Sequence, residues 1–245
     1  MALAESAGPQ LPLALRAPPD QRFDRFVDAP SGLLEQLRAL AEGAPSQSVF
    51  LCGPHSSGKT HLLLAACADA EAAGRRAVYL GLRDLRGKAR AVLQAVTADL
   101  VALDDLEAVV GEREDALALF DLYNAQRARG GGLLLAAADS PDALAVALPD
   151  LRSRLAQCTR WTLPTLDDGG RVRMLRLRAA ARGLEFDDAA LDWMLRRCSR
   201  DPGSLAALFE QLDRASLAEK RGRLTVPFLR QVLEAQGSPE RSSGG

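Results

Sequence analysis

Apolar and polar positions follow two different periods along residues 31–164. Short apolar runs predict strands, and longer segments with apolar positions three and four residues apart predict helices between them. The predicted strands cover residues 48–52, 77–82, 100–103, 132–137 and 159–163. The predicted helices cover residues 31–41 (with Ser31 as the expected N-cap), 59–73, 85–97, 114–129, 142–147 and 149–156. Short apolar strands that alternate with helices indicate an α/β fold whose parallel sheet is covered on both faces.

Beyond Pro164 only the helical period remains. The predicted helices there cover residues 167–182, 187–198, 202–220 and 226–235. This change predicts an α/β domain at residues 31–164 and a small all-α domain at residues 165–237. Residues 1–30 are rich in proline and alanine and are expected to form an extended arm, whereas the polar tail at residues 238–245 is expected to be disordered.

Composition and charge limit the classes of function. The chain has 245 residues, of which 47% are hydrophobic, so it is long enough to bury a substantial core. Its net charge of −1 and its pI of about 6.2 argue against a strong binder of duplex DNA. No apolar run is long enough to cross a membrane, and no signal-peptide pattern is visible. We therefore expect a cytoplasmic protein whose scattered cysteines are reduced rather than paired or bound to zinc: Cys52, Cys67, Cys158 and Cys198.

A phosphate-binding loop is the clearest chemical motif. The chain fits G-x-x-x-x-G-K-[ST] at every fixed position, between a predicted strand and a predicted helix. Backbone N–H groups and the helix N-terminus would hold phosphates, Lys59 would reach the β- and γ-phosphates, and the Thr60 hydroxyl would bind Mg²⁺. The motif and the histidine after it comprise Gly53, Pro54, His55, Ser56, Ser57, Gly58, Lys59, Thr60 and His61. The sequence thus predicts a site for ADP or ATP with Mg²⁺, rather than a glycine loop that only turns the chain.

Aspartates follow two of the later predicted strands. Asp104 and Asp105 end the apolar run at residues 100–103, where a carboxylate usually accompanies such a loop. Asp104 would orient Mg²⁺, and Asp105 would position or polarise the attacking water, a role in which glutamate is more usual. Asp139 follows the predicted strand at residues 132–137. Because ligands meet the carboxyl ends of parallel strands, Asp139 either lies near the γ-phosphate or caps the next turn.

The order of these motifs resembles that of AAA+ ATPases. A Leu-Arg-Ser-Arg-Leu segment at residues 151–155 and Arg200 before an apolar helix continue the family's order. Within AAA+ proteins the chain resembles the DnaA branch, and especially the Hda (DnaA regulatory inactivator) family, at residues 22–27, 211–216 and 224–228. The resemblance covers residues 10–235. It implies a five-stranded parallel sheet followed by an all-α lid domain.

The resemblance also implies roles for individual residues. Phe26 and Val27 match the box that contacts adenine. Arg154, within Ser-Arg-Leu, matches the arginine finger that one subunit projects into the nucleotide site of the next, and Arg152 is the competing candidate. Arg200 matches the sensor 2 arginine that reaches from the lid to the phosphates, although the residues after it depart from the DnaA pattern.

A short motif in the N-terminal arm indicates a partner. It resembles the sequence with which bacterial proteins bind the sliding clamp, the β subunit of DNA polymerase III, and it comprises Gln10, Leu11, Pro12, Leu13, Ala14 and Leu15. The glutamine would enter a polar subsite and the leucines an apolar groove, while the proline would reduce the entropy lost on ordering. Packing of the same leucines along the protein's own surface is the alternative.

Three functions agree with these features. The resemblance favours a clamp-tethered regulator that promotes hydrolysis of the ATP bound to DnaA and thereby blocks re-initiation of DNA replication. Such a protein would associate with DNA through the clamp, and would stimulate its partner's ATPase rather than turn over ATP efficiently itself. The alternatives are an ATPase that loads a helicase or remodels DNA, and a nucleotide-gated replication adaptor without a finger. A homodimer or higher oligomer is compatible with each.

Overall fold

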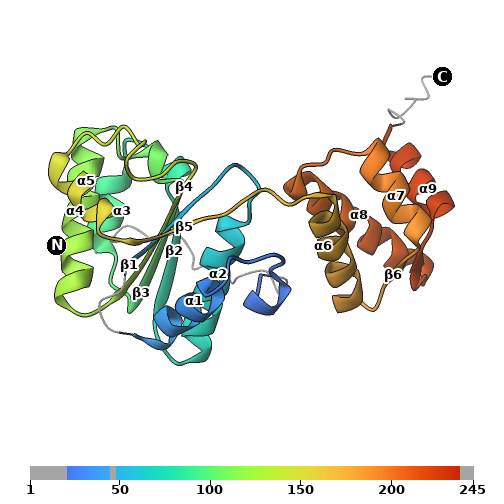
Figure 1. Cartoon of the computed structure of the whole chain (residues 1–245), viewed down its shortest axis with the longest axis horizontal. Helices are drawn as coiled ribbons and strands as arrows, with labels where there is room; N and C mark the ends of the chain where they lie inside the picture. The colour runs from blue at the N-terminus through green and yellow to red at the C-terminus, as the bar shows by residue number, and fades with distance from the viewer. Residues whose placement is uncertain (1–20, 45–47, 238–245) are drawn as a thin grey trace, which may run out of the picture. The chain divides into compact units, whose positions relative to one another are not determined.

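The computed structural model describes residues 21–44 and 48–237 of the chain. The chain divides into two compact units, Met1–Pro164 and Thr165–Gly245 (Figure 1). The predicted clamp motif at residues 10–15 and the predicted tail at residues 238–245 lie outside the described residues.

A five-stranded sheet forms the centre of the first unit (Figure 1). Its strands are β1 (Ser48–Cys52), β2 (Ala77–Gly81), β3 (Leu100–Asp104), β4 (Gly132–Ala137) and β5 (Thr159–Thr162). They lie in the order β2-β3-β4-β1-β5, and neighbouring strands are parallel. This sheet confirms the predicted α/β fold class.

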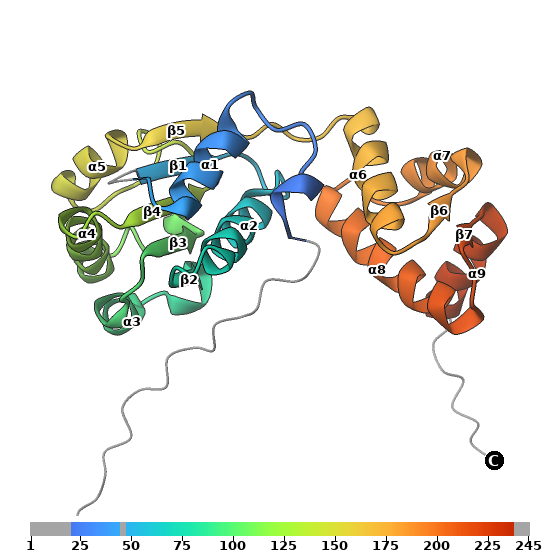
Figure 2. The ribbon, with the colours of Figure 1, turned by 90° about the horizontal axis from the view of Figure 1, so that it is seen from below.

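Helices cover both faces of the sheet, because successive residues of a strand point to opposite sides. In β1, Val49 and Leu51 belong to the core beneath α1 (Leu33–Glu42) and α2 (Lys59–Ala72). Phe50 and Cys52 face the opposite core, which α3 (Ala89–Ala95), α4 (Arg113–Ala128) and α5 (Pro149–Ala156) cover. Figure 2 shows these two layers of helices on either side of the sheet. With both faces covered, a strand such as β1 can be apolar along its whole length.

The predicted helix at residues 142–147 is wrong. The segment forms turns, in which the N–H groups of Ala143 and Leu144 both bond to the carbonyl of Ser140. It lies between Pro141 and Pro149, and a helix this short is marginal by itself, so its tertiary contacts decide its conformation. The alternate residues Leu144 and Val146 are buried instead.

Two predicted helix boundaries also differ from the structure. α1 begins at Leu33 with Gly32 (φ 84°) as its N-cap, and no side chain caps it, so the predicted cap at Ser31 is wrong. The predicted helix at residues 85–97 is shorter: a 3-10 turn at Leu82–Leu85 precedes α3. Gly87, with φ of 71°, separates the two, because its left-handed backbone cannot continue a helix.

The second unit contains α6 (Asp168–Ala181), α7 (Asp188–Arg197), α8 (Pro202–Glu219) and α9 (Val226–Gly237). It is not purely helical, because β6 (Glu185–Phe186) and β7 (Arg223–Leu224) form a parallel pair that the sequence pattern missed. Strands of two residues are too short to display a period. The rings of Phe186 and Phe209 lie 6.2 Å apart in the core of this unit.

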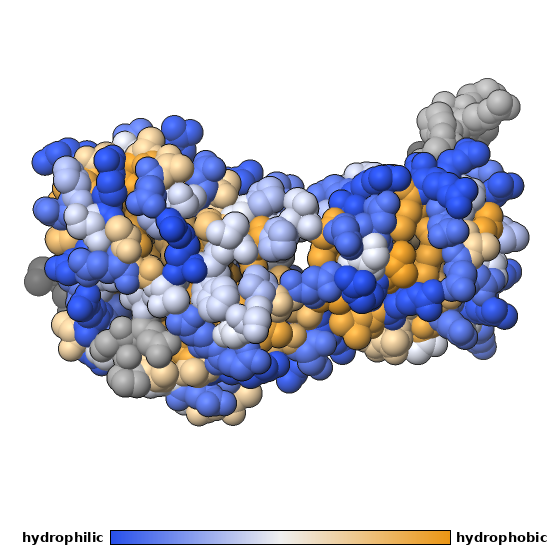
Figure 3. Space-filling model, viewed as in Figure 1, coloured by the Kyte–Doolittle hydropathy of each residue, from blue (hydrophilic) through white to orange (hydrophobic). Residues whose placement is uncertain are grey.

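Hydrophilic side chains cover much of the face of the first unit seen in Figure 3. Among the described residues, the large hydrophobic side chains that remain exposed are Leu117 and Leu217. None of the helices that the structure describes is both long enough and apolar enough to cross a membrane.

Candidate functional site

The loop that follows β1 requires glycine at its first position. Gly53 has φ of 156°, and a Cβ there would lie 2.4 Å from the carbonyl oxygen of Leu163. Its N–H donates a hydrogen bond to the carbonyl of Ala138 at 3.1 Å. The loop therefore begins against the segments that follow β4 and β5. It lies at the carboxyl ends of the parallel strands, where ligands bind.

The predicted adenine-contacting segment lies beside this loop. A Cβ at Gly58 would lie 2.5 Å from Cε2 of Phe26, so the aromatic ring packs directly on the loop backbone. Phe26 also packs against His61, with ring centroids 5.5 Å apart. The Nε2 atom of His61 lies 2.8 Å from the carbonyl oxygen of Arg22, which requires a proton on that nitrogen. Val27, partly buried, follows Phe26.

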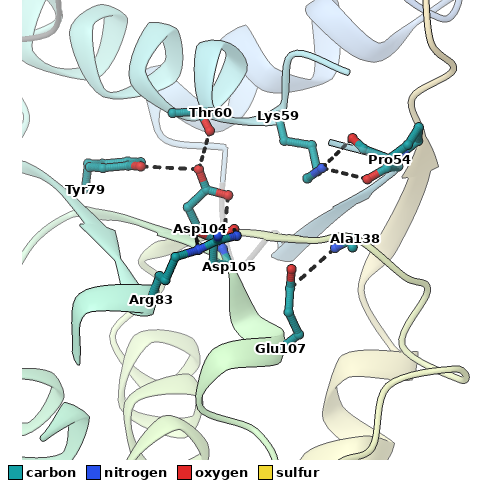
Figure 4. Close-up of polar contacts among 10 residues, drawn as sticks. Pro54, Lys59, Thr60, Tyr79, Arg83, Asp104, Asp105, Glu107 and Ala138 are labelled. Atoms are coloured by element: carbon teal, nitrogen blue, oxygen red, sulfur yellow. Dashed lines mark hydrogen bonds and ion pairs between the residues drawn. The ribbon is translucent and has the colours of Figure 1, made fainter. Parts of the chain in front are cut away.

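Lys59 and the start of α2 place positive charge at the loop. The ammonium group of Lys59 donates hydrogen bonds to the carbonyls of Gly53 at 2.6 Å and Pro54 at 2.9 Å (Figure 4). α2 begins at Lys59, so the N–H groups of its first turn have no partners within the helix. A glycine loop with these N–H groups and an ammonium group is suited to bind phosphates.

The carboxylate of Asp104 is buried and accepts three hydrogen bonds. Its Oδ2 atom accepts from the Thr60 hydroxyl at 2.5 Å and from the Tyr79 hydroxyl at 3.2 Å, and its Oδ1 atom accepts from the Asp105 N–H at 3.0 Å (Figure 4). Thr60 and Asp104, predicted to serve one Mg²⁺ ion, are thus in direct contact. A hydroxyl beside a carboxylate is the oxygen donor set that Mg²⁺ prefers, so the residues fit this ion.

Sequence reasoning missed two side chains from the β2 end of the site. Burial and the Asp104 carboxylate raise the pKa of the Tyr79 phenol. Arg83 bonds both carboxylate oxygens of Asp105, each at 3.2 Å, and this hydrogen bond raises the pKa of the guanidinium. The carboxylate predicted to act on water is therefore paired with a cation. The available signal was that Tyr79 lies within a predicted strand and Arg83 directly after it, and that this strand precedes in the chain the one that carries the aspartates.

Asp139 follows β4 and is exposed, and its side chain makes no hydrogen bond or ion pair within the described ranges. The structure thus gives no support to a capping role for this residue. Its neighbour Ala138 donates its N–H to the carboxylate of Glu107 at 3.4 Å, which points toward this part of the site (Figure 4). Glu107 was also missed, because a single glutamate after the aspartate pair has no motif of its own.

The two arginines of α5 differ in their contacts. Arg152 donates a hydrogen bond from Nη2 to the carbonyl of Val146 at 3.1 Å. The partly buried Arg154 makes no side-chain hydrogen bond or ion pair with any residue that the structure describes. Its guanidinium is therefore the one with its donors unused.

Arg200 belongs to the second unit and precedes α8. Its Nη1 atom lies 3.6 Å from a carboxylate oxygen of Asp168, and its Nε atom donates to the carbonyl of Leu195 at 3.4 Å. These residues line a pocket of about 520 Å³ within that unit. Asp201 after it caps α8 by accepting from the N–H of Ser204.

The four cysteines are free thiols, and Cys198 is the one that is not buried. Across residues 21–44 and 48–237, no three His, Cys, Asp or Glu side chains come together as ligands for a metal ion.

Comparison with known proteins places the chain. A family model described as "Hda, lid domain" matches residues 168–233, which lie in the second unit. An uncharacterized protein of Haemophilus influenzae is 37% identical over 227 residues, which make up 91% of this chain and 98% of that protein.

Solved structures share the fold. Domain III of the replication initiation protein DnaA from Thermotoga maritima superposes with a TM-score of 0.73 at 19% identity, over 91% of this chain and 99% of that one. AMPPCP-bound DnaA from Aquifex aeolicus gives a TM-score of 0.64 at 22% identity, over 83% of this chain and 69% of that one. The second unit therefore carries the lid domain of the Hda family, and the chain shares the fold of domain III of DnaA.

Proposed function

We propose that this protein is a nucleotide-bound regulator that, tethered to the DNA-loaded sliding clamp, promotes hydrolysis of the ATP bound to DnaA and so blocks re-initiation. The Hda lid domain and the DnaA-like AAA+ fold support a role beside DnaA in replication. The observation that carries the finer proposal is Arg154, whose guanidinium has no partner within the described residues.

The regulator would hold ADP or ATP at the loop of residues 53–60. The loop N–H groups and Lys59 would bind the phosphates, and Phe26 with Val27 would contact adenine. Thr60 and Asp104 would serve Mg²⁺, which completes its oxygen shell with phosphate and water. The AMPPCP-bound DnaA of the same fold supports nucleotide binding here. Asp139 and Arg200 would contact the phosphates from the end of β4 and from the second unit.

Arg154 would act on the nucleotide of the partner rather than on its own. The planar guanidinium presents paired N–H donors that match phosphate oxygens, and it stays charged at any physiological pH. Placed on the γ-phosphate of DnaA-bound ATP, it would stabilise the charge that builds up during hydrolysis. Arginines in this role accelerate hydrolysis by about 10³–10⁵-fold in other NTPases. Because Arg152 is already bonded to Val146, Arg154 is the better candidate of the two.

The arm would supply the tether. Gln10, Leu11, Pro12, Leu13, Ala14 and Leu15 would bind the clamp, and DNA association would be indirect, through the clamp. Tethering makes the encounter with DnaA effectively intramolecular, so it would raise the rate without any new contact at the finger.

The test measures release of labelled phosphate from ATP-loaded DnaA, with DNA-loaded clamp and this protein, in the presence of either ADP or ATP. Arg154→Ala should return hydrolysis to its basal rate, whereas Arg152→Ala, the matched control on the same helix, should keep the stimulation. A Gln10→Ala, Leu13→Ala double variant should lose the part of the stimulation that depends on the DNA-loaded clamp.

Basal hydrolysis with the unaltered protein would refute the regulator proposal. Stimulation that survives Arg154→Ala but is lost with Arg152→Ala would transfer the finger to Arg152. Binding to DnaA without stimulation would favour a nucleotide-gated adaptor, and efficient turnover of ATP by this protein alone would favour a helicase-loader type of ATPase.

A further inference from the structure

Tyr79 connects β2 with the carboxylate at the end of β3. Gly81, rather than Tyr79, lies in register with Asp104, so the Tyr79 side chain has to reach along its own strand to meet that carboxylate. It passes over Gly81, where a Cβ would lie 3.7 Å from the Tyr79 hydroxyl. The phenol then donates a hydrogen bond to Asp104 Oδ2 at 3.2 Å (Figure 4). A Cβ at this glycine would therefore be in ordinary van der Waals contact with the phenol, and a larger side chain there would crowd it.

The orientation of the Asp104 carboxylate depends on the donors around it. The torsion that turns a carboxylate plane is broad, so rotamer preference alone does not fix it. Oδ2 is held by the hydroxyls of Thr60 from α2 and Tyr79 from β2, at 2.5 Å and 3.2 Å. Asp104 is only 3% exposed, so water competes little for these bonds. With two donors on Oδ2 and one on Oδ1, the remaining lone pair of the carboxylate, on Oδ1, points in a defined direction.

We propose that Tyr79 is a positioning residue for Mg²⁺: its hydroxyl holds Asp104 in the orientation that supports an ion on Thr60. The proposal rests on the nucleotide-binding part of the proposed function and needs neither DnaA nor the clamp. Hydrogen-bond partners of metal-supporting side chains typically contribute about 10–100-fold to metal affinity. Because Thr60 and the Asp105 N–H would still hold Asp104, loss of the phenol hydroxyl should give about tenfold, the lower end of that range.

The test is the Mg²⁺ dependence of binding of a fluorescent ADP analogue. Tyr79→Phe keeps the ring and removes only the donor. It should raise the Mg²⁺ concentration for half-maximal binding about tenfold and leave the affinity measured in EDTA unchanged. Tyr123→Phe is the matched control, because Tyr123 is the other tyrosine of the chain and is buried in the core on the opposite face of the sheet. It should leave the Mg²⁺ dependence unaltered.

A second variant perturbs the same hydroxyl through a neighbouring residue. Gly81→Val keeps the phenol but adds methyl groups beyond a Cβ that would already contact the Tyr79 hydroxyl, so it should displace the hydroxyl and shift the Mg²⁺ dependence in the same direction. An unchanged Mg²⁺ dependence in Tyr79→Phe would overturn the proposal, even if the variant melts at a lower temperature, because the phenol would then only fill space. Failure of the unaltered protein to bind the analogue would refute the nucleotide site and this role together, so the two failures are distinguishable.

Discussion

Replacing Gly58 with alanine should destabilise the first unit through two separate effects. Gly58 has φ of 94°, where a residue with a Cβ is strained by about 1–2 kcal/mol. The new Cβ would also lie 2.5 Å from Cε2 of Phe26, so the ring has to move. Overpacking of this kind costs about 1–3 kcal/mol. The sum predicts a loss of about 2–5 kcal/mol in the free energy of unfolding.

Two further variants separate these effects. Gly74 has φ of 75°, and a Cβ added there would meet nothing within 4 Å, so Gly74→Ala should show the backbone effect alone, about 1–2 kcal/mol. In a Phe26→Ala background, Gly58→Ala should likewise cost only about 1–2 kcal/mol, because the ring that it displaces is gone. The double-mutant cycle should therefore give a coupling energy of about 1–3 kcal/mol.

Urea unfolding followed by tryptophan fluorescence measures these free energies. The chain has two tryptophans, so a Trp193→Phe background leaves Trp161 of β5 as a reporter of the first unit. If the separate costs of Gly58→Ala and Phe26→Ala add up to the cost of the double variant to within about 0.5 kcal/mol, Phe26 does not press on the loop. Equal costs for Gly58→Ala and Gly74→Ala would lead to the same conclusion.

Three other predictions follow from the contacts of single residues. Arg83→Ala should raise the protein's own single-turnover ATP hydrolysis several-fold, because it frees Asp105, and adding Asp105→Asn must abolish the gain; an unchanged rate would contradict the role of the pair. Arg75→Ala should lower the free energy of unfolding by about 2–3 kcal/mol, because Arg75 donates to the carbonyls of Leu40 and Ala41 at the end of α1; a loss below about 0.5 kcal/mol would argue against this cap. Burial raises the pKa of the Cys67 and Cys158 thiols from 9.0 to about 12. The free energy of unfolding should therefore fall as pH rises from about 9 toward 12, because the thiols ionise in the unfolded protein but not in the folded one. Urea midpoints that stay constant across that range would contradict this.

The sheet could be predicted because its signal is local. Strands such as β1 and β4 are buried on both faces, so each appears in the sequence as an apolar run that ends at glycine or a polar residue. The segment at residues 142–147 has the same apolar character, but the carbonyls of Ser140 and Val110 receive its N–H groups instead of a helical ladder. Competition of that kind depends on the fold and is not visible in the local sequence.

The candidate site was predictable only where a motif fixes its spacing. Thr60 and Asp104 were paired from the loop motif and the apolar strand, and their side chains are in contact. Tyr79 lies 25 positions before Asp104 in the chain, and Arg83 lies 22 positions before Asp105. Their contacts depend on the register between β2 and β3, which alternation alone does not determine.

The contrast between Asp105 and Arg154 bears on whether this protein would hydrolyse its own nucleotide or act on the nucleotide of its partner in the proposed complex. A carboxylate that polarises water has to be free to accept its proton, yet both oxygens of Asp105 are bonded to Arg83. A finger has to be free to donate, and the guanidinium of Arg154 has no partner within the described residues. A protein with the first property would hold its nucleotide rather than consume it, and one with the second would act on a neighbour's nucleotide. The paired Asp105 carboxylate and the unpaired Arg154 guanidinium together favour a regulator over a self-sufficient ATPase. Arg83→Ala would change only the first property, and Arg154→Ala only the second.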